Sequence, residues 1–310
     1  MLKLEYPIIM APMFLVSNVD MVVEATKAGI TGCIPALNWR NESDLRKGLE
    51  ELKRRTQGSW GINLIVNKSN IKLDYQIKAC MDIQPDYLIT SLGNPSKVIG
   101  QAHEQGIKVF CDVTDLGYAE KVVKAGCDGL IAVNAEAGGH RGMISFKELI
   151  PSLVKEFEVP VISAGGVGDR KSLDEKLALG AEAVSIGSPF IATAESPVSQ
   201  EYKQACVEYG AKDIVDTTKI SGSKLTVINT PYVQEIGTEQ NWLEKLLSRN
   251  KWLKKYVKML TFAKGMKSVE KAAFAATYKT VWCAGPSIEY TTSVQKVSEV
   301  VKRLMSADSE

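Results

Sequence analysis

The stretch AVNAEAGGHRGMISF, residues 132–146, contains His140, one of only two histidines in a chain of 310 residues. Gly138, Gly139 and Gly142 surround it, so the backbone can approach a ligand and few side chains pack against the imidazole. Because imidazole exchanges a proton near neutral pH, we interpret His140 as a group that binds or deprotonates a substrate. A loop histidine with a purely local hydrogen bond is the alternative.

Metal chemistry is not expected at His140, because no second histidine or cysteine lies at a ligand spacing from it. His103, in QAHEQG, has the pattern of a solvated residue near a helix end. The six cysteines form no CxxC pair, and several lie in apolar runs. They are typical of reduced, buried thiols, which predicts a cytoplasmic protein without a disulfide framework.

Two glycine-containing segments follow predicted strands near the middle of the chain. SAGGVGD covers residues 163–169 and SIGSPF covers residues 185–190. Backbone N–H groups in such loops, aided by the positive end of a following helix, bind phosphate well. We therefore expect a phosphate to be held by four residues: Gly165, Gly166, Gly187 and Ser188. Plain tight turns are the alternative interpretation.

Further candidates lie at the ends of the other predicted strands. Ala11, Pro12 and Met13 end the first, Asn63 lies in the third, and Ser91 ends the fourth. A flat heterocycle needs backbone donors and acceptors and an amide at its edge, which these positions can supply. Each of them taken singly is as well explained by bonds to the local backbone.

These candidates need a fold that brings strand ends together. Eight short apolar runs recur at intervals of about 20–30 residues, each apolar through its middle like a parallel strand buried on both faces. The runs cover residues 7–12, 31–36, 60–66, 87–91, 108–113, 129–134, 160–165 and 183–188. Charged amphipathic helices are predicted between them, among others at residues 42–55, 115–126, 145–157 and 169–180.

This alternation predicts a mixed α/β chain folded as a closed (β/α)8 TIM barrel, whose active site lies at the carboxyl ends of the strands. A doubly wound open sheet is the competing fold. A dinucleotide-binding sheet of that kind has GxGxxG after its first strand, whereas this chain continues there with APMFLVSN. We assign residues 1–214 to the barrel, residues 215–285 to a small, mainly helical lobe, and residues 286–310 to a helix returning to the barrel wall.

Net charge and hydropathy limit the classes of partner that we expect. The formal net charge is +2, which gives no electrostatic reason to expect nucleic acid. The basic run at residues 251–258 is best explained as a solvated helix face. No stretch approaches eighteen uninterrupted apolar residues, so we expect no membrane span, and the N-terminal residues lack the layout of a signal peptide.

The chain resembles the nitronate monooxygenase family, formerly the 2-nitropropane dioxygenases. The segments that carry the resemblance are YPIIMAPM, GINL, NAEAGGHRG, VPVISAGGVGD, LGAEAVSIGSPFIAT and ISGSKLTVINTPYV. EAGGH followed by AGG also marks a related family, the flavin-dependent enoyl-acyl-carrier-protein reductase II.

The resemblance implies FMN at the barrel mouth, with its phosphate on the loops after strands seven and eight. By position, Asn63 matches the family's flavin-contacting asparagine and Gly138 the first glycine of its GGH. Gly187 and Ser188 match its last phosphate-binding pair, and His140 falls on its active-site histidine.

Two departures from the family pattern concern the cofactor. Val133 stands where the family often has a flavin-contacting glutamine, and Gly187-Ser188 replaces the common Gly-Thr. The first change bears on how the flavin is tuned, whereas the second keeps the hydroxyl. The APM of the first strand is closer to the monooxygenases than to the QGGM usual in the reductases.

Three functions follow as hypotheses. The first is oxidation of small alkyl nitronates with FMN and dioxygen. The second is reduction of an enoyl thioester, with NAD(P)H as the electron donor. The third is a flavin-binding module without catalysis, which Val133 leaves open. A small-molecule substrate is expected under the first two, and a homodimer stays open.

Overall fold

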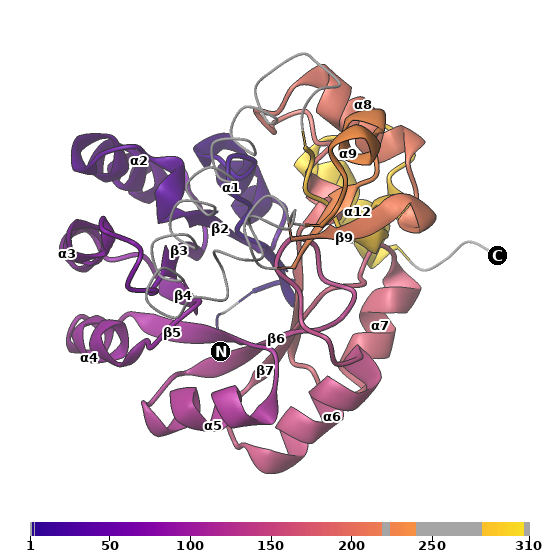
Figure 1. Ribbon diagram of the computed structural model, residues 1–310. Helices are drawn as coiled ribbons and strands as arrows, with labels where there is room; N and C mark the ends of the chain where they lie inside the picture. Colours follow the sequence, from indigo (N-terminus) through magenta and orange to yellow (C-terminus); the bar gives the residue numbers. More distant parts are fainter. Residues whose placement is uncertain (1, 3, 219–223, 240–280, 307–310) are drawn as a thin grey trace.

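In the computed structural model, residues 2, 4–218, 224–239 and 281–306 are described. Eight parallel strands close into a barrel in the order β1 to β8, with β1 hydrogen-bonded to both β2 and β8 (Figure 1). The strands are β1 (Ile8–Met10), β2 (Thr31–Pro35), β3 (Trp60–Ile65), β4 (Tyr87–Ser91), β5 (Lys108–Val113), β6 (Gly129–Val133), β7 (Val161–Ala164) and β8 (Ala183–Ile186). The predicted TIM barrel is confirmed, and every strand lies within its predicted range.

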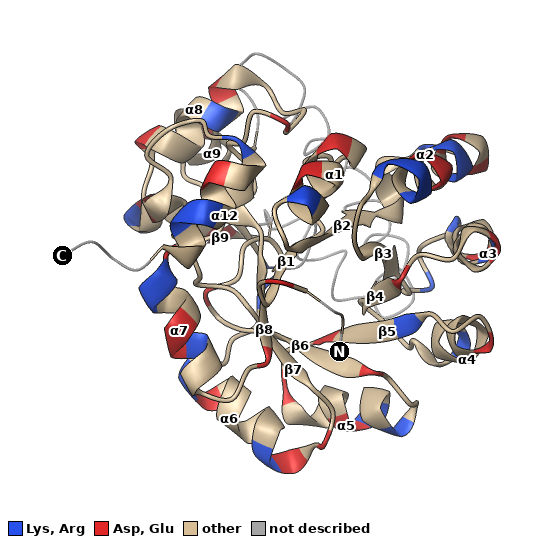
Figure 2. Cartoon of the chain, turned by 180° about the vertical axis from the view of Figure 1, so that it is seen from behind, with Lys and Arg blue, Asp and Glu red and all other residues tan. Residues whose placement is uncertain are grey.

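Helices surround the strands. They are α1 (Val19–Lys27), α2 (Glu42–Arg55), α3 (Leu73–Ile83), α4 (Ser96–Glu104), α5 (Leu116–Lys124), α6 (Phe146–Glu156) and α7 (Arg170–Ala178). Several begin at a side-chain cap: Asn41 accepts the Asp44 N–H at the start of α2, and Asp169 accepts that of Ser172 at the start of α7. The last helix, α12 (Val297–Met305), contacts both α7 and α1 and so fills the wall between them. Charged residues of both signs cover these helices (Figure 2).

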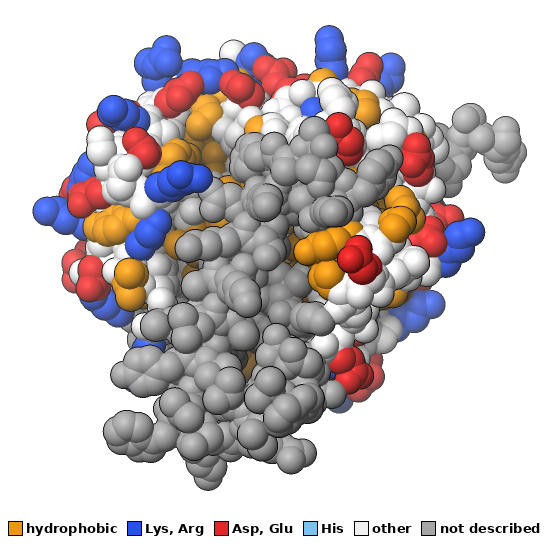
Figure 3. Space-filling view, turned by 45° about the horizontal axis from the view of Figure 1, so that its top comes forward, with side chains coloured by type: hydrophobic (Ala, Val, Ile, Leu, Met, Phe, Trp, Pro, Cys, Tyr) orange, Lys and Arg blue, Asp and Glu red, His pale blue; other side chains and the backbone are white. Residues whose placement is uncertain are grey.

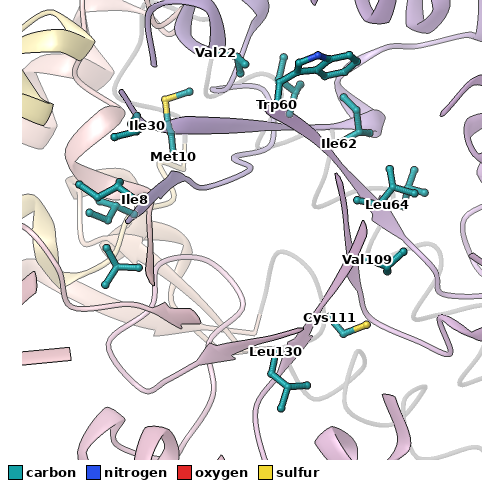
Figure 4. Packing of buried hydrophobic residues seen from close by; sticks show 14 of the residues in the cluster. Ile8, Met10, Val22, Ile30, Trp60, Ile62, Leu64, Val109, Cys111 and Leu130 are labelled. Carbon is teal, nitrogen blue, oxygen red and sulfur yellow. The ribbon is translucent and has the colours of Figure 1, made fainter. Parts of the chain in front are cut away.

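The alternation of side chains along each strand decides which residues can reach the site. One set packs outward against the helices, including Val109 and Cys111 of β5 (Figure 4). The other set packs inside the barrel, including Phe110 of β5. Because side chains alternate between the two faces of a strand, Asn63, Ser91 and Asp112 all point into the barrel near the carboxyl ends of β3, β4 and β5.

The chain beyond β8 contains elements that the sequence did not predict. After α8 (Gln200–Glu208), strands β9 (Ile214–Thr217) and β10 (Leu225–Ile228) pair antiparallel, and a short helix α9 (Pro231–Ile236) follows. Residues 240–280 of the predicted helical lobe, which include the basic run at residues 251–258, lie outside the described residues. Among the described helices, none is long and apolar enough to cross a bilayer.

Candidate active site

A cavity of about 560 Å³ opens at the carboxyl ends of the barrel strands, within the size range of small-molecule sites. Every residue that the sequence predicted for the site lines it. These residues are Ala11, Pro12, Met13, Asn63, Ser91, Gly138, His140, Gly165, Gly166, Gly187 and Ser188. Val133 also lines the cavity. His103 lies elsewhere, on α4, where its Nε2 is 2.8 Å from Asp128 Oδ2.

The loop after β7 requires its two glycines. Gly165 has φ +115°, and a Cβ there would lie 2.5 Å from the Ala137 nitrogen and 2.6 Å from Asn134 Oδ1. Gly166 has φ +75°, and its Cβ would overlap the Glu136 carboxylate. Asn134, fully buried, connects this loop to the loop after β6 because its Nδ2 donates to the Gly165 carbonyl at 3.2 Å. The two loops are therefore in close contact at the cavity edge.

Gly138 and Ser188 meet a third segment of the chain. The Gly285 N–H donates to Ser188 Oγ at 2.8 Å, and a Cβ on Gly138 would lie 2.8 Å from that same nitrogen. Gly187 differs from the other glycines, because its φ is −109° and a Cβ there would meet Met13 Sδ at an ordinary 3.5 Å. Its conformation does not require glycine.

Backbone donors are available at this edge. Within the described residues, the N–H groups of Gly165, Gly166 and Gly187 find no acceptor at hydrogen-bond distance. Polar backbone groups that lack an internal partner are satisfied by solvent or by a ligand. Three such N–H groups together with the Ser188 hydroxyl suit an anion such as a phosphate.

The opposite side of the cavity is built from side chains. Asn63 Nδ2 donates to the Ile89 carbonyl at 3.1 Å and to Ser91 Oγ at 2.7 Å. Ser91 Oγ in turn donates to Asp112 Oδ2 at 2.5 Å. Both amide hydrogens of Asn63 are thus engaged, which leaves its Oδ1 as the group that can accept a bond from a ligand.

Asp112 is a cavity residue that the sequence analysis missed. Burial raises the pKa of its carboxyl to about 6, although the hydrogen bond from Ser91 opposes the shift. A carboxyl group so placed changes charge within the physiological range. The only signal in the sequence was an acidic residue near the end of KVFCDV, a strand whose other residues after Lys108 are apolar.

Cys283 is a second missed residue, from the segment that follows the undescribed residues. It lines the cavity, and burial raises the pKa of its thiol to about 12, so the thiol is neutral at pH 7. Tyr202 of α8 holds this segment by donating to the Cys283 carbonyl at 2.5 Å and by stacking on Trp282 at 5.5 Å between ring centroids. Among the described residues, no cluster of three His, Cys, Asp or Glu side chains is placed to hold a metal ion.

Comparison with known proteins decides the family. The sequence profile of the nitronate monooxygenase family matches residues 1–307. The chain belongs to the nitronate monooxygenase family. It is therefore an oxidoreductase, as the resemblance implied. A probable nitronate monooxygenase of Staphylococcus aureus is 27% identical over 280 residues, covering 76% of this chain and 79% of the relative.

Solved structures share the whole fold with this member of the nitronate monooxygenase family. FabK from Thermotoga maritima superimposes with a TM-score of 0.85 at 27% identity, covering 98% of this chain and 93% of FabK. Nitroalkane oxidase from Streptomyces ansochromogenes superimposes with a TM-score of 0.82 at 20% identity, covering 97% of this chain and 95% of the oxidase. At that identity the second likeness bears on the fold alone.

Proposed function

We propose that the protein is an FMN-dependent nitronate monooxygenase, which oxidises small alkyl nitronates with dioxygen. The observation that carries the proposal is the cavity itself, where His140 and the N–H groups of Gly165, Gly166 and Gly187 surround one space at the barrel mouth. Family membership supports a flavin, and the glycine loops after β7 and β8 support the phosphorylated form, FMN.

The residues around the cavity fit the parts of FMN. The phosphate would bind to the N–H groups of Gly165, Gly166 and Gly187, which have no acceptor in the described part of the chain, and to the Ser188 hydroxyl. Asn63, with both amide hydrogens engaged, would accept a bond from the ring through Oδ1. Ala11, Pro12, Met13, Ser91 and Gly138 would border the ring.

FMN, when bound, supplies the redox chemistry with dioxygen. His140 supplies the acid–base chemistry. Its protonated imidazole can donate a hydrogen bond to the anionic oxygens of a nitronate. Its neutral form can take the proton from the nitro-bearing carbon of the parent nitroalkane, which leaves the nitronate and the protonated imidazole. The cavity walls are largely apolar and include Val133, so they would disfavour water next to the reacting atoms.

The test compares the two histidines. In protein loaded with FMN, we expect His140→Ala to lower kcat/KM for oxygen uptake with propyl-2-nitronate by on the order of 100-fold, because a positioned acid–base group contributes about that much. His103→Ala is the matched control and should leave turnover unchanged, since His103 lies on α4 beside Asp128. Equal turnover of the wild type and His140→Ala, with FMN retained, would contradict the role of His140.

One observation favours a second function, reduction of an enoyl thioester with NAD(P)H. FabK, an enoyl-acyl-carrier-protein reductase II, matches over 98% of this chain. An anaerobic assay with crotonyl thioester and NADPH or NADH separates the functions, because nitronate oxidation by this route consumes oxygen. Thioester reduction under argon would replace our proposal, and inactivity in both assays would favour a flavin-binding module without catalysis. A cytoplasmic location and a homodimer belong to the proposal, and size-exclusion chromatography with light scattering tests the latter.

A further inference from the structure

The loop that carries His140 is held from outside the barrel. Gly139 and Gly142 flank the histidine on either side, and Gly139 has φ +75°. Glycine has more conformational freedom in the unfolded chain than any other residue, so a loop this rich in glycine does not order itself. A defined position for the imidazole therefore needs contacts from other segments.

One anchor binds the residue before His140. The Gly139 N–H donates to Thr226 Oγ1 at 2.8 Å, and the Thr226 N–H donates to the Gly139 carbonyl at 3.0 Å. Both backbone polar groups of Gly139 are thus satisfied by Thr226 of β10, and Thr226 is buried, with 3% of its surface exposed. Because Thr226 is buried, a hydroxyl or N–H group of Thr226 that lost its bond to Gly139 would have little access to water, so these bonds are costly to break.

The second anchor binds the residue after His140. Arg141 contacts Asp216 of β9 through two bonds, Nε to Oδ1 at 2.9 Å and Nη2 to Oδ2 at 2.5 Å. Its Nη1 donates to the Ala135 carbonyl at 2.8 Å, within the same loop. The hydrogen bonds from Arg141 lower the pKa of the Asp216 carboxyl, so the pair is charged at neutral pH. Planar, two-point arginine–carboxylate pairs constrain orientation as well as distance.

The two anchors meet on the hairpin. Asp216 and Thr226 are cross-strand partners in the antiparallel register of β9 and β10. The residues on both sides of His140 are therefore attached to the two members of a single pair. Apolar contacts of Leu225 and Val227 with Val233 and Val281 fix the hairpin in turn.

We infer that the Asp216–Thr226 pair of hairpin β9–β10 is a positioning device for His140, acting through Arg141 and Gly139. The hairpin contributes to the reaction by holding the imidazole at the cavity edge, and Arg141, Asp216 and Thr226 are its positioning residues. The catalytic part of this inference rests on the proposed function, whereas the structural part stands without it.

Histidine NMR tests the structural part directly. With only two histidines in the chain, a sample labelled with ¹³C and ¹⁵N at histidine shows two imidazole Cε1–H signals, assigned with His140→Ala. We expect Asp216→Asn and Thr226→Val to shift or broaden the His140 signal and to leave the His103 signal in place. Thr226→Ser, which keeps the hydroxyl, should retain the wild-type His140 signal.

A matched control separates this effect from a general loss of an ion pair. Asp174 accepts two bonds from Arg170 on α7, at 2.9 and 2.8 Å, so Asp174→Asn makes the same chemical change away from the loop. It should leave both histidine signals unchanged. An intact His103 signal in every variant also reports that the barrel is folded.

Turnover of nitronate tests the catalytic part. We expect kcat to fall on the order of 10- to 100-fold in Asp216→Asn and Thr226→Val, as for a misplaced acid–base group. Thr226→Ser, which retains the hydroxyl, should keep the wild-type kcat. An unchanged His140 signal in both Asp216→Asn and Thr226→Val would overturn the inference. Activity that survives in His140→Ala while Asp216→Asn still moves the His140 signal would instead overturn the role of His140 and leave the positioning intact.

Discussion

The two sides of the cavity are built from different materials. At the ends of β7 and β8 the site consists of backbone, with N–H groups exposed by Gly165 and Gly166 in left-handed conformations. At the ends of β3, β4 and β5 it consists of side chains, in the series Asn63, Ser91 and Asp112. Backbone N–H groups can bind an anion without a positively charged side chain. The side-chain series instead presents one oriented hydrogen-bond acceptor, Asn63 Oδ1. Each side therefore suits a different part of a phosphorylated heterocycle.

Replacing a glycine on the backbone side should have the largest effect on stability and binding. Gly165→Ala places a Cβ 2.5 Å from the Ala137 nitrogen at φ +115°, so the loop must move. We expect a loss of about 2 kcal/mol in the free energy of unfolding, with FMN affinity lowered at least about 10-fold. Gly187→Ala is the matched control. The φ of −109° at Gly187 is open to alanine, and the added methyl group would lie at an ordinary contact distance of 3.5 Å from Met13 Sδ.

Chemical denaturation and fluorescence titration with FMN measure both quantities. Equal effects of the two glycine substitutions would contradict the distinction between a strained loop after β7 and an ordinary turn after β8.

The side-chain side should respond to pH. Burial raises the pKa of Asp112 to about 6 in the folded protein, above its usual 3.8. The folded state then holds this proton more tightly than the unfolded chain, so the contribution of Asp112 to stability is greatest below pH 4 and is lost as the pH rises through 6. The shift corresponds to at most on the order of 3 kcal/mol.

Asp112→Asn removes this titration. With both proteins free of FMN, we expect Asp112→Asn to have a higher Tm than the wild type at pH 8. This difference in Tm should disappear near pH 4. Asp216 provides the opposite sign, because Arg141 lowers its pKa and Asp216→Asn should destabilise the protein at pH 8. Parallel Tm profiles of the wild type and Asp112→Asn between pH 4 and 8 would show that Asp112 is not the group responsible.

The two sides also differ in how far the sequence predicts them. The alternation of apolar runs and helices predicted the barrel, and the rule that barrel sites lie at the carboxyl ends of strands predicted which residues meet. Gly165 and Gly166 were recognisable because glycine pairs mark unusual backbone conformations. Gly187 was chosen by the same logic, although its φ of −109° makes no such demand.

What the sequence did not predict depends on contacts between distant segments. Asp112 reads as an isolated polar residue until the barrel places it beside Ser91, 21 positions earlier. Arg141 and Asp216 are 75 positions apart, and Gly139 and Thr226 are 87 apart. Local propensity carries no information on such pairings, because strand pairing is decided by packing rather than by the strand alone.

In the proposed function, the backbone side of the cavity binds the phosphate of FMN. Parallel titrations of the protein with FMN and with riboflavin, which lacks the phosphate, test it most directly. We predict that FMN binds at least about 100-fold more tightly, as several charge-assisted hydrogen bonds would give. Equal affinity for FMN and riboflavin, or no binding of either, would contradict it.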